Sequence, residues 1–307
     1  MAEIRGVLPV LQTPFCEDEQ VDWECLSREV AWALRVGADG ICSAMVSEWL
    51  RLVPEERTRY MNLMVEAAGG QGIVVASVGA ESTIEAVRYA RAAENAGCDA
   101  VMAIPPIGAV LPESELETHF CRIAQSVSLP LIVQDASSYV GHAFSLELMA
   151  RLLDRFGPDK ILFKPEAAPL GPNLSALRDA TAGSARVFDG SGGIMLIDAY
   201  RRGITGTIPA VDLLESIVAL WKALEQGDEE RAYEIYLPLC AMVALQMQAG
   251  LDGFLAIEKY LLVKHGVFTS ARRRRPITWE LDDETRAEVD RLDARLRAAL
   301  DSGQTGR

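Results

Sequence analysis

The chain contains few of the residues from which metal and disulfide sites are built. Its 307 residues include only three histidines, and no two of them have the spacing of a pair of zinc ligands. Its six cysteines are scattered without a C-x-x-C pair, which predicts reduced thiols in a cytoplasmic protein. We therefore expect neither a metal site nor a disulfide framework.

Positive charge and long apolar runs are also scarce. The 30 Lys and Arg residues stand against 44 Asp and Glu, a net charge of -14, so nucleic acid and anionic membranes are not expected as partners. The one basic run, at residues 272–275, is expected to pair with acidic neighbours or to lie in an exposed loop. No apolar run approaches the roughly 20 residues of a membrane helix, and the first residues lack the apolar segment of a signal peptide.

Motifs for nucleotides and for serine hydrolases are missing too. The chain has no P-loop, no G-x-G-x-x-G and no G-x-S-x-G. We therefore expect no nucleotide cofactor.

What the sequence does contain is a regular alternation of strand and helix patterns. Short apolar runs are separated by longer segments whose apolar residues recur at i, i+3 and i+4. The expected strands are residues 6–11, 40–44, 73–77, 100–104, 131–134, 161–164, 187–189 and 205–207. The expected helices between and after them are residues 22–36, 54–68, 83–96, 113–127, 145–156, 174–181, 194–202 and 211–226.

Eight strand–helix units with continuously apolar strands predict an α/β fold, a (β/α)8 barrel over residues 1–226. A doubly wound open sheet is the alternative, but its dinucleotide motif is absent. The pattern then becomes all helical at residues 229–248, 253–265 and 282–300. We expect residues 227–300 to form a C-terminal helical extension packed on the barrel, and residues 301–307 to be a disordered tail.

Lys164 ends the apolar strand pattern Ile-Leu-Phe-Lys and is followed by Pro165 and Glu166. Lysine is rarely buried unless it is paired or functional, and apolar surroundings disfavour its ammonium form, which frees an amine to attack a carbonyl. Alone, this segment favours a lysine that extends its ammonium into water. A barrel reverses that preference, because active sites lie at the C-terminal ends of the strands. Strand alternation places Glu166 on the same face as Lys164.

The same rule selects residues at the other strand ends as candidates for a substrate site. For Glu48, Asp135 and Glu166, a structural cap or salt bridge is the alternative role. The candidates are Met45, Val46, Ser47 and Glu48 at the end of the second strand, Ser77 at the end of the third, Gln134 and Asp135 at the end of the fifth, Asp189, Gly190 and Gly192 at the end of the seventh, and Thr207 and Ile208 at the end of the eighth.

Six segments together resemble the dihydrodipicolinate synthase and N-acetylneuraminate lyase superfamily, the class I Schiff-base lyases. They are LPVLQTPF (8–15), GADGICSAMVSEWLRLVPEER (37–57), AGCDAVMAIPP (96–106), LPLIVQD (129–135), ILFKPE (161–166) and FDGSGG (188–193). The resemblance implies that Lys164 forms an imine with a 2-keto acid, with no metal or nucleotide cofactor. It also implies a homo-oligomer, a dimer or a tetramer.

The chain departs from the family pattern at the positions that, by the resemblance, bind the substrate carboxylate and transfer protons. The second-strand motif G-[ST]-T-G-E is replaced by Ala44 to Glu48, which leaves Ser47 and backbone N–H groups for the substrate carboxylate. The fifth-strand tyrosine aligns with Gln134, an amide that orients a water or hydroxyl but does not relay protons. Proton transfer is then expected from Glu48, Glu166, Asp135 or a bound water.

These departures make the condensation of lysine biosynthesis an unfavoured alternative, because the arginine for a second carboxylate is also missing from residues 136–141. The chain resembles more closely the branch of the family that dehydrates 2-keto-3-deoxy sugar acids, such as the L-2-keto-3-deoxyarabonate dehydratases. The residues that carry this resemblance are Val133-Gln134-Asp135 at the fifth strand and Ser47-Glu48 after the second. A pyruvate-dependent aldolase remains open, since both reactions use the same imine. A catalytically degenerate, ligand-binding barrel is the alternative from another class.

Overall fold

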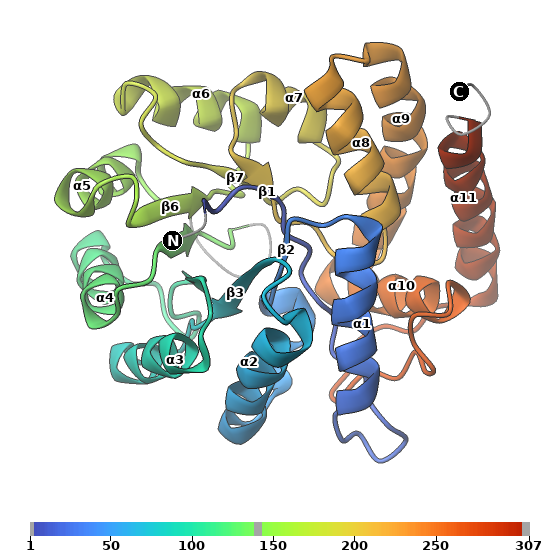
Figure 1. Ribbon diagram of the computed structural model, residues 1–307, viewed down its shortest axis with the longest axis horizontal. Helices are drawn as coiled ribbons and strands as arrows, with labels where there is room; N and C mark the ends of the chain where they lie inside the picture. Colours follow the sequence, from blue (N-terminus) through green and yellow to red (C-terminus); the bar gives the residue numbers. More distant parts are fainter. Residues whose placement is uncertain (1–2, 138–142, 303–307) are drawn as a thin grey trace.

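The computed structural model describes residues 3–137 and 143–302, and it confirms the predicted (β/α)8 barrel (Figure 1). All strand pairs are parallel. One sheet contains β2 (Gly40–Cys42), β3 (Ile73–Ser77), β4 (Ala100–Ala103), β5 (Leu131–Gln134) and β6 (Ile161–Lys164), and the other contains β1 (Gly6–Val7), β8 (Gly206–Thr207) and β7 (Phe188–Asp189). Bridges from Val10 to Cys42 and from Phe163 to Val187 join the two sheets into a closed ring.

A ring of helices surrounds the strands, with one helix after each strand (Figure 1). Short 3-10 turns, η1 (Met45–Ser47) and η2 (Trp49–Arg51), precede the second helix. The helices are α1 (Trp23–Val36), α2 (Pro54–Ala68), α3 (Thr83–Ala96), α4 (Glu113–Ser126), α5 (Leu146–Phe156), α6 (Leu170–Ala180), α7 (Leu196–Arg201) and α8 (Leu214–Gln226).

The start of α6 differs from the prediction, which placed it at residue 174. The helix begins at Leu170, and Gly171 and Pro172 lie in its first turn. Glycine and proline are residues typical of loops in sequence. Proline is tolerated in a first turn because the N–H that it lacks has no helical partner at that position.

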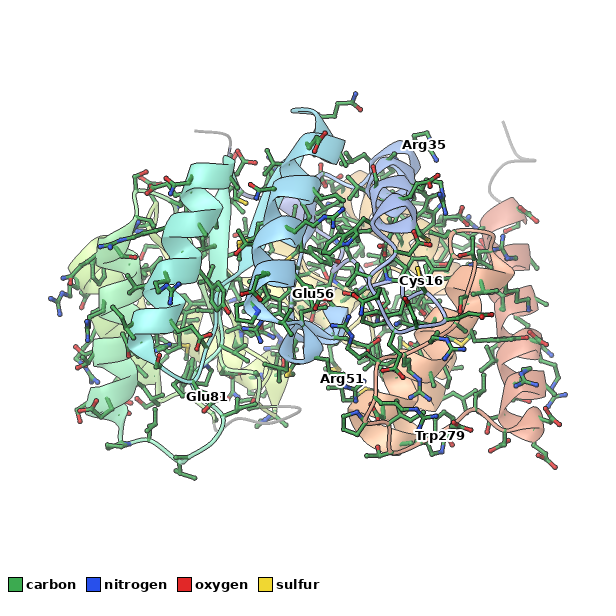
Figure 2. All side chains as sticks on the ribbon, turned by 90° about the horizontal axis from the view of Figure 1, so that it is seen from below. Cys16, Arg35, Arg51, Glu56, Glu81 and Trp279 are labelled. Carbon is green, nitrogen blue, oxygen red and sulfur yellow. The ribbon has the colours of Figure 1, made fainter. Side chains whose placement is uncertain are left out.

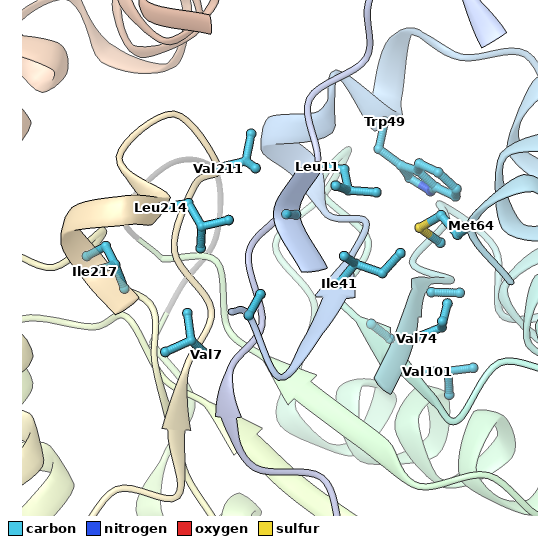
Figure 3. Packing of buried hydrophobic residues seen from close by; sticks show 14 of the residues in the cluster. Val7, Leu11, Ile41, Trp49, Met64, Val74, Val101, Val211, Leu214 and Ile217 are labelled. Carbon is cyan, nitrogen blue, oxygen red and sulfur yellow. The ribbon is translucent and has the colours of Figure 1, made fainter. Parts of the chain in front are cut away.

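The core has two layers that follow from the alternation of side chains along each strand. Alternate residues such as Val75, Ile132 and Leu162 fill the interior of the barrel. Their neighbours face outward and pack against the helices, as Figure 3 shows for Ile41 and Val74 beside Trp49 and Met64. This alternation decides which strand-end side chains point into the mouth of the barrel.

Three further helices follow the barrel: α9 (Glu229–Gln246), α10 (Gly250–Lys264) after the short turn η3 (Met247–Ala249), and α11 (Asp283–Ser302). Helix α9 packs between α8 and α11, beside the barrel (Figure 1). The stretch Glu229–Lys264 is long and apolar enough to cross a membrane by length and composition alone, but half of its most apolar window is buried in the protein, as in a core helix. Helix α11 reaches Ser302, two residues into the predicted tail, and residues 303–307 lie outside the described part.

The basic run pairs with acidic neighbours, one of the two roles predicted for it. Arg274 forms a two-pronged ion pair with Glu56, at 2.6 and 2.8 Å, and Arg273 donates to the backbone oxygen of Asp252. On the barrel side, Arg51 binds the Asp252 carboxylate at 2.7 Å. Figure 2 shows Arg51 and Glu56 where the barrel meets these C-terminal helices. These ion pairs therefore hold the C-terminal extension against the loop after β2 and the first turn of α2.

Asp293 provides a test of how α11 is held. Its carboxylate lies 2.9 Å from His265 and 3.0 Å from Lys264, at the end of α10. Burial alone raises an aspartate pKa, but the hydrogen bonds from His265 and Lys264 outweigh it and lower the pKa of Asp293 to about 2. A lowered folded-state pKa contributes stability above about pH 4, and that contribution is lost as the pH falls towards 2.

We therefore expect Asp293→Asn to reduce the free energy of unfolding at pH 7 by on the order of 1 to 2 kcal/mol. The gap to the wild type should shrink between pH 5 and pH 2 in urea titrations. Asp283→Asn, at an exposed carboxylate of the same helix, should leave stability unchanged. A gap for Asp293→Asn that is constant over this pH range would contradict the assignment.

Candidate active site

Lys164 and Gln134 are neighbours at the C-terminal ends of adjacent strands. The parallel register of β5 and β6 pairs Gln134 with Lys164 directly. Both follow inward-facing residues by two positions, Ile132 and Leu162, so alternation points both side chains into the mouth of the barrel. Lys164 is only 4% exposed. The predicted lysine is therefore buried among strand ends, and its ammonium does not extend into bulk water.

Glu166 joins the two side chains. Its Oε1 lies 2.5 Å from Nζ of Lys164 and 2.7 Å from Nε2 of Gln134, which donates to it. The predicted sharing of one face by Lys164 and Glu166 is thus observed. The amide orientation leaves Oε1 of Gln134 buried without a hydrogen-bond partner among the described residues. This oxygen is available to accept a hydrogen bond from a bound molecule.

Asp135 holds Glu166 in place through the backbone. Its Oδ1 accepts the N–H of Glu166 at 3.0 Å, and its Oδ2 accepts that of Ala167 at 3.3 Å. Ser137 donates both its N–H and its hydroxyl to Oδ1. Burial raises the pKa of the Asp135 carboxyl, the Ser137 N–H opposes this, and the nearby Glu166 carboxylate adds to it. Asp135 does not line the cavity, so the structure gives it a positioning role.

A cavity of about 410 Å³ opens above the lysine. This volume lies within the usual range for small-molecule sites. Among the predicted site residues, those that line it are Met45, Val46, Gln134, Lys164, Glu166, Gly190, Gly192 and Ile208. The structure therefore brings residues from the ends of β2, β5, β6, β7 and β8 to one site.

Gly190 makes room for the reacting groups. A Cβ atom at this position would lie 2.9 Å from Nζ of Lys164 and 3.0 Å from Oε1 of Glu166. Contacts that short are not tolerated unless those side chains move. The glycine of the loop after β7 thus keeps space for a ligand against the lysine.

The loop after β2 presents backbone donors instead of hydroxyls. The N–H groups of Met45 and Val46 make no hydrogen bond with any described residue, and both residues line the cavity. Ser47, predicted to bind substrate, donates its hydroxyl to the Leu11 oxygen and accepts the N–H of Ala44 at 3.1 Å. Its side chain therefore shapes this loop, and the two N–H groups without a partner among the described residues belong to residues that line the cavity.

Three other predicted substrate contacts lie behind the cavity wall. Asp189 accepts the N–H of Ser191 and the Thr207 hydroxyl, each at 3.2 Å. Burial raises the pKa of Asp189, although hydrogen bonds from Ser191 and Thr207 and the charge of Lys164 oppose this. Ser77 donates its N–H to the hydroxyl of Ser43. Neither Ser77, Asp189 nor Thr207 lines the cavity, so they support the strand ends from below.

Glu48 forms salt bridges outside the cavity, which is the alternative role predicted for it. Its Oε1 lies 2.5 Å from Nζ of Lys259, and its Oε2 lies 2.8 Å from Arg51. Lys259, on α10, is fully buried and also lies over the ring of Phe15. Burial lowers the pKa of Lys259, and Glu48 opposes that shift. Glu48 does not line the cavity.

Sequence reasoning missed Lys259, which lies in the apolar helix segment Leu255-Ala-Ile-Glu-Lys-Tyr-Leu-Leu-Val263. Two charges inside so apolar a segment were the available signal, since buried charges require partners. That signal does not name the partner. Glu48 and Lys259 lie 211 positions apart in the chain.

We expect Glu48→Gln to lower the free energy of unfolding by about 3–5 kcal/mol, because Lys259 would keep a buried charge without its partner. Lys164 in the folded fraction should still react with a keto acid. The double variant Glu48→Gln/Lys259→Met should recover most of the lost stability, as measured in urea titrations. Wild-type stability combined with loss of reaction at Lys164 would instead make Glu48 a catalytic residue.

Comparison with known proteins agrees with this geometry. The model of the dihydrodipicolinate synthetase family matches residues 3–295. An L-2-keto-3-deoxyarabonate dehydratase of Azospirillum brasilense is 29% identical over 95% of this chain and 94% of its own length. A 4-hydroxy-tetrahydrodipicolinate synthase of Methanopyrus kandleri is 28% identical over 77% of this chain and 79% of its own.

Solved structures share the fold at lower identity. The 4-hydroxy-tetrahydrodipicolinate synthase of Methylacidiphilum fumariolicum superposes with a TM-score of 0.88 at 22% identity, covering 99% of both chains. YagE, a prophage protein of Escherichia coli from the dihydrodipicolinic acid synthase family solved in complex with pyruvate, gives the same TM-score and identity over 96% of this chain and 99% of its own. The family model spans nearly the whole chain, and the protein therefore belongs to the dihydrodipicolinate synthetase family of lyases.

Proposed function

We propose that this protein is a class I Schiff-base lyase that dehydrates a 4-hydroxy-2-keto acid. The observation behind the proposal is the buried amine of Lys164, which faces the cavity 2.5 Å from the Glu166 carboxylate. An amine held in this way adds to carbonyl carbons, and a carboxylate beside it exchanges the protons that the addition requires.

The first step forms the imine. The Lys164 ammonium loses a proton to Glu166, and the free nitrogen bonds to C2 of the keto acid. The carbonyl oxygen takes up two protons and leaves as water, so that a C2=N double bond remains. The N–H groups of Met45 and Val46 supply two donors for the C1 carboxylate next to the bond being formed.

The second step eliminates water. Glu166 removes a proton from C3, and the electron pair moves into the imine as an enamine. The enamine electrons then expel the C4 hydroxyl, which leaves as water when it is protonated. One water hydrolyses the unsaturated imine and returns the Lys164 amine, so the net reaction is the loss of one water from the acid. Gln134 supports these steps by donating to Glu166 and by offering its buried Oε1 to a hydroxyl or water.

The class of substrate takes support from the relatives. The dehydratase of Azospirillum brasilense acts, by its name, on L-2-keto-3-deoxyarabonate, which is a 4-hydroxy-2-keto acid. This supports the sugar acids that the sequence favoured. An aldolase would break the C3–C4 bond from the same imine, and product analysis separates pyruvate plus an aldehyde from an acid with all its carbons. Condensation with a second carboxylate is less supported, because no arginine lines the described part of the cavity.

The remaining expectations belong to the same proposal. The side-chain chemistry above requires neither a metal nor a nucleotide. The six cysteines are free, which supports a cytoplasmic location. A homo-oligomer, a dimer or tetramer, is proposed on the family resemblance, and sedimentation would measure it.

Imine trapping tests the proposal directly. Incubation with pyruvate and then borohydride should add one reduced adduct, visible in the intact mass and mapped to the peptide of Lys164. Lys164→Met should abolish the adduct, while the half-buried Lys160 and the buried Lys259 stay unlabelled because they donate to fixed protein groups. A folded protein that gives no adduct with any 2-keto acid would leave the ligand-binding barrel as the better description.

Glu166→Gln should separate binding from proton transfer. The adduct with pyruvate should still form, more slowly, whereas kcat for dehydration should fall by roughly 10²- to 10⁴-fold, the usual contribution of a general acid–base group. Glu147→Gln, at an exposed carboxylate on α5, is the matched control and should retain full activity. Unchanged kcat in Glu166→Gln would assign the proton steps to another group or to water.

A further inference from the structure

The described lining of the cavity contains few side chains that could form hydrogen bonds with a chain of hydroxyl groups. Apart from Gln134, Lys164 and Glu166, its described lining contains only two polar side chains, Ser191 and Asp198. Both oxygens of Asp198 bind Arg202, at 2.9 and 3.0 Å. The Ser191 hydroxyl oxygen already accepts the N–H of Met195 at 3.0 Å.

Most of the wall is apolar. It includes Ile194, Met195, Ile208, Val243, Met247 and Phe254. The last three come from the C-terminal helices and the turn between them, and these elements contribute no polar side chain to the lining.

This apolar wall lies close to the reacting lysine. A Cβ at Gly190 would meet Lys164, and a Cβ at Gly192, two residues further on, would meet Val243 at 3.7 Å. At Gly193 a Cβ would lie 2.6 Å from Leu239, so α9 packs tightly on this glycine loop. Val243 and Met247 are four positions apart and line the cavity together. A substituent that extends from C4 of a bound acid therefore meets hydrocarbon within a short distance.

The size of the cavity leaves room for such a substituent. The keto-acid head fills only a small part of about 410 Å³. A hydroxylated tail placed against hydrocarbon loses hydrogen bonds to water without replacing them, which is unfavourable. An apolar tail in the same place gains free energy in proportion to the area that it removes from water.

We propose that the substrate is a 4-hydroxy-2-keto acid whose C4 carries an apolar aliphatic or aryl group, and not a polyhydroxylated sugar chain. The proposal rests on the proposed function, since it names the substrate class of the same site. It departs from the sugar acid that the sequence and the relative's name favoured. The reason is the lining of the cavity, to which the C-terminal helices contribute only apolar side chains.

Competitive trapping on Lys164 tests the proposal with four acids: pyruvate, 2-keto-3-deoxyarabonate, 4-hydroxy-2-keto-4-phenylbutanoate and 4-hydroxy-2-keto-6-methylheptanoate. The concentration for half-maximal labelling should be at least tenfold lower for the two apolar acids than for the sugar acid, because several buried carbons each contribute a few-fold. Equal or tighter labelling by the sugar acid overturns the inference. Absence of labelling by pyruvate as well overturns the proposed function, so the two failures are distinguishable.

A variant pair locates the effect. Met247 is 43% exposed, so Met247→Gln should fold normally and place an amide in the wall. It should reduce the preference for the apolar acids by several-fold, measured as the ratio of their half-maximal labelling concentrations to that of the sugar acid in the same variant. Leu237→Gln changes an apolar residue on α9 that is 65% exposed and outside the cavity, and it should leave the preference intact. An unchanged preference in Met247→Gln would show that this wall does not contact the substrate.

Discussion

The ion pair between Lys164 and Glu166 is the constraint on which the rest of the site depends. Burying two charges is unfavourable unless each finds a close partner and further hydrogen bonds. Here the two groups lie 2.5 Å apart, Gln134 donates to Glu166, and Asp135 binds the backbone of Glu166. The strands β5 and β6 are thereby tied together at their C-terminal ends. A pair of this kind contributes little net stability, so its chemistry explains its presence better than the fold does.

The C-terminal helices are part of the site as well as of the scaffold. A second buried pair, Glu48 with Lys259, joins the loop after β2 to α10. That loop carries the free N–H groups of Met45 and Val46, so the position of α10 bears on where a carboxylate would bind. Helix α9 packs on the glycine loop after β7 and adds Val243 to the wall. The C-terminal helices and the turn between them thus form part of the cavity wall.

The replacements relative to the family motif all remove hydroxyl-bearing side chains. Where the family motif has hydroxyl side chains after the second strand, this chain presents Met45 and Val46, and where the motif has a tyrosine it presents Gln134. In the proposed reaction, backbone N–H groups and Glu166 would bind the carboxylate and move protons. The polar groups gather around Lys164, and the rest of the described wall is largely apolar. If the ligands are keto acids, which share the same head, selection among them would fall to this apolar wall.

Much of this architecture was predictable because it depends on local pattern. Apolar runs and helical periodicity determined the order of strands and helices, and alternation along β6 put Lys164 and Glu166 on one face. The start of α6 was missed because a proline in a first helical turn resembles a loop in sequence. The assignment of Glu48 needed its partner Lys259, which no local pattern identifies.

The sequence by itself determined the barrel, the lysine at the end of its sixth strand, and the ring of strand ends from which the site is built. Only the tertiary structure decided which of those strand-end residues face the cavity. Ser47, Glu48, Asp135, Asp189 and Thr207 all lie at or just after strand ends, yet none of them lines the cavity and each binds another protein group. Hydrogen bonds and burial are satisfied between segments far apart in the chain, so the direction of each side chain depends on contacts that exist only once the barrel and its C-terminal helices have packed together.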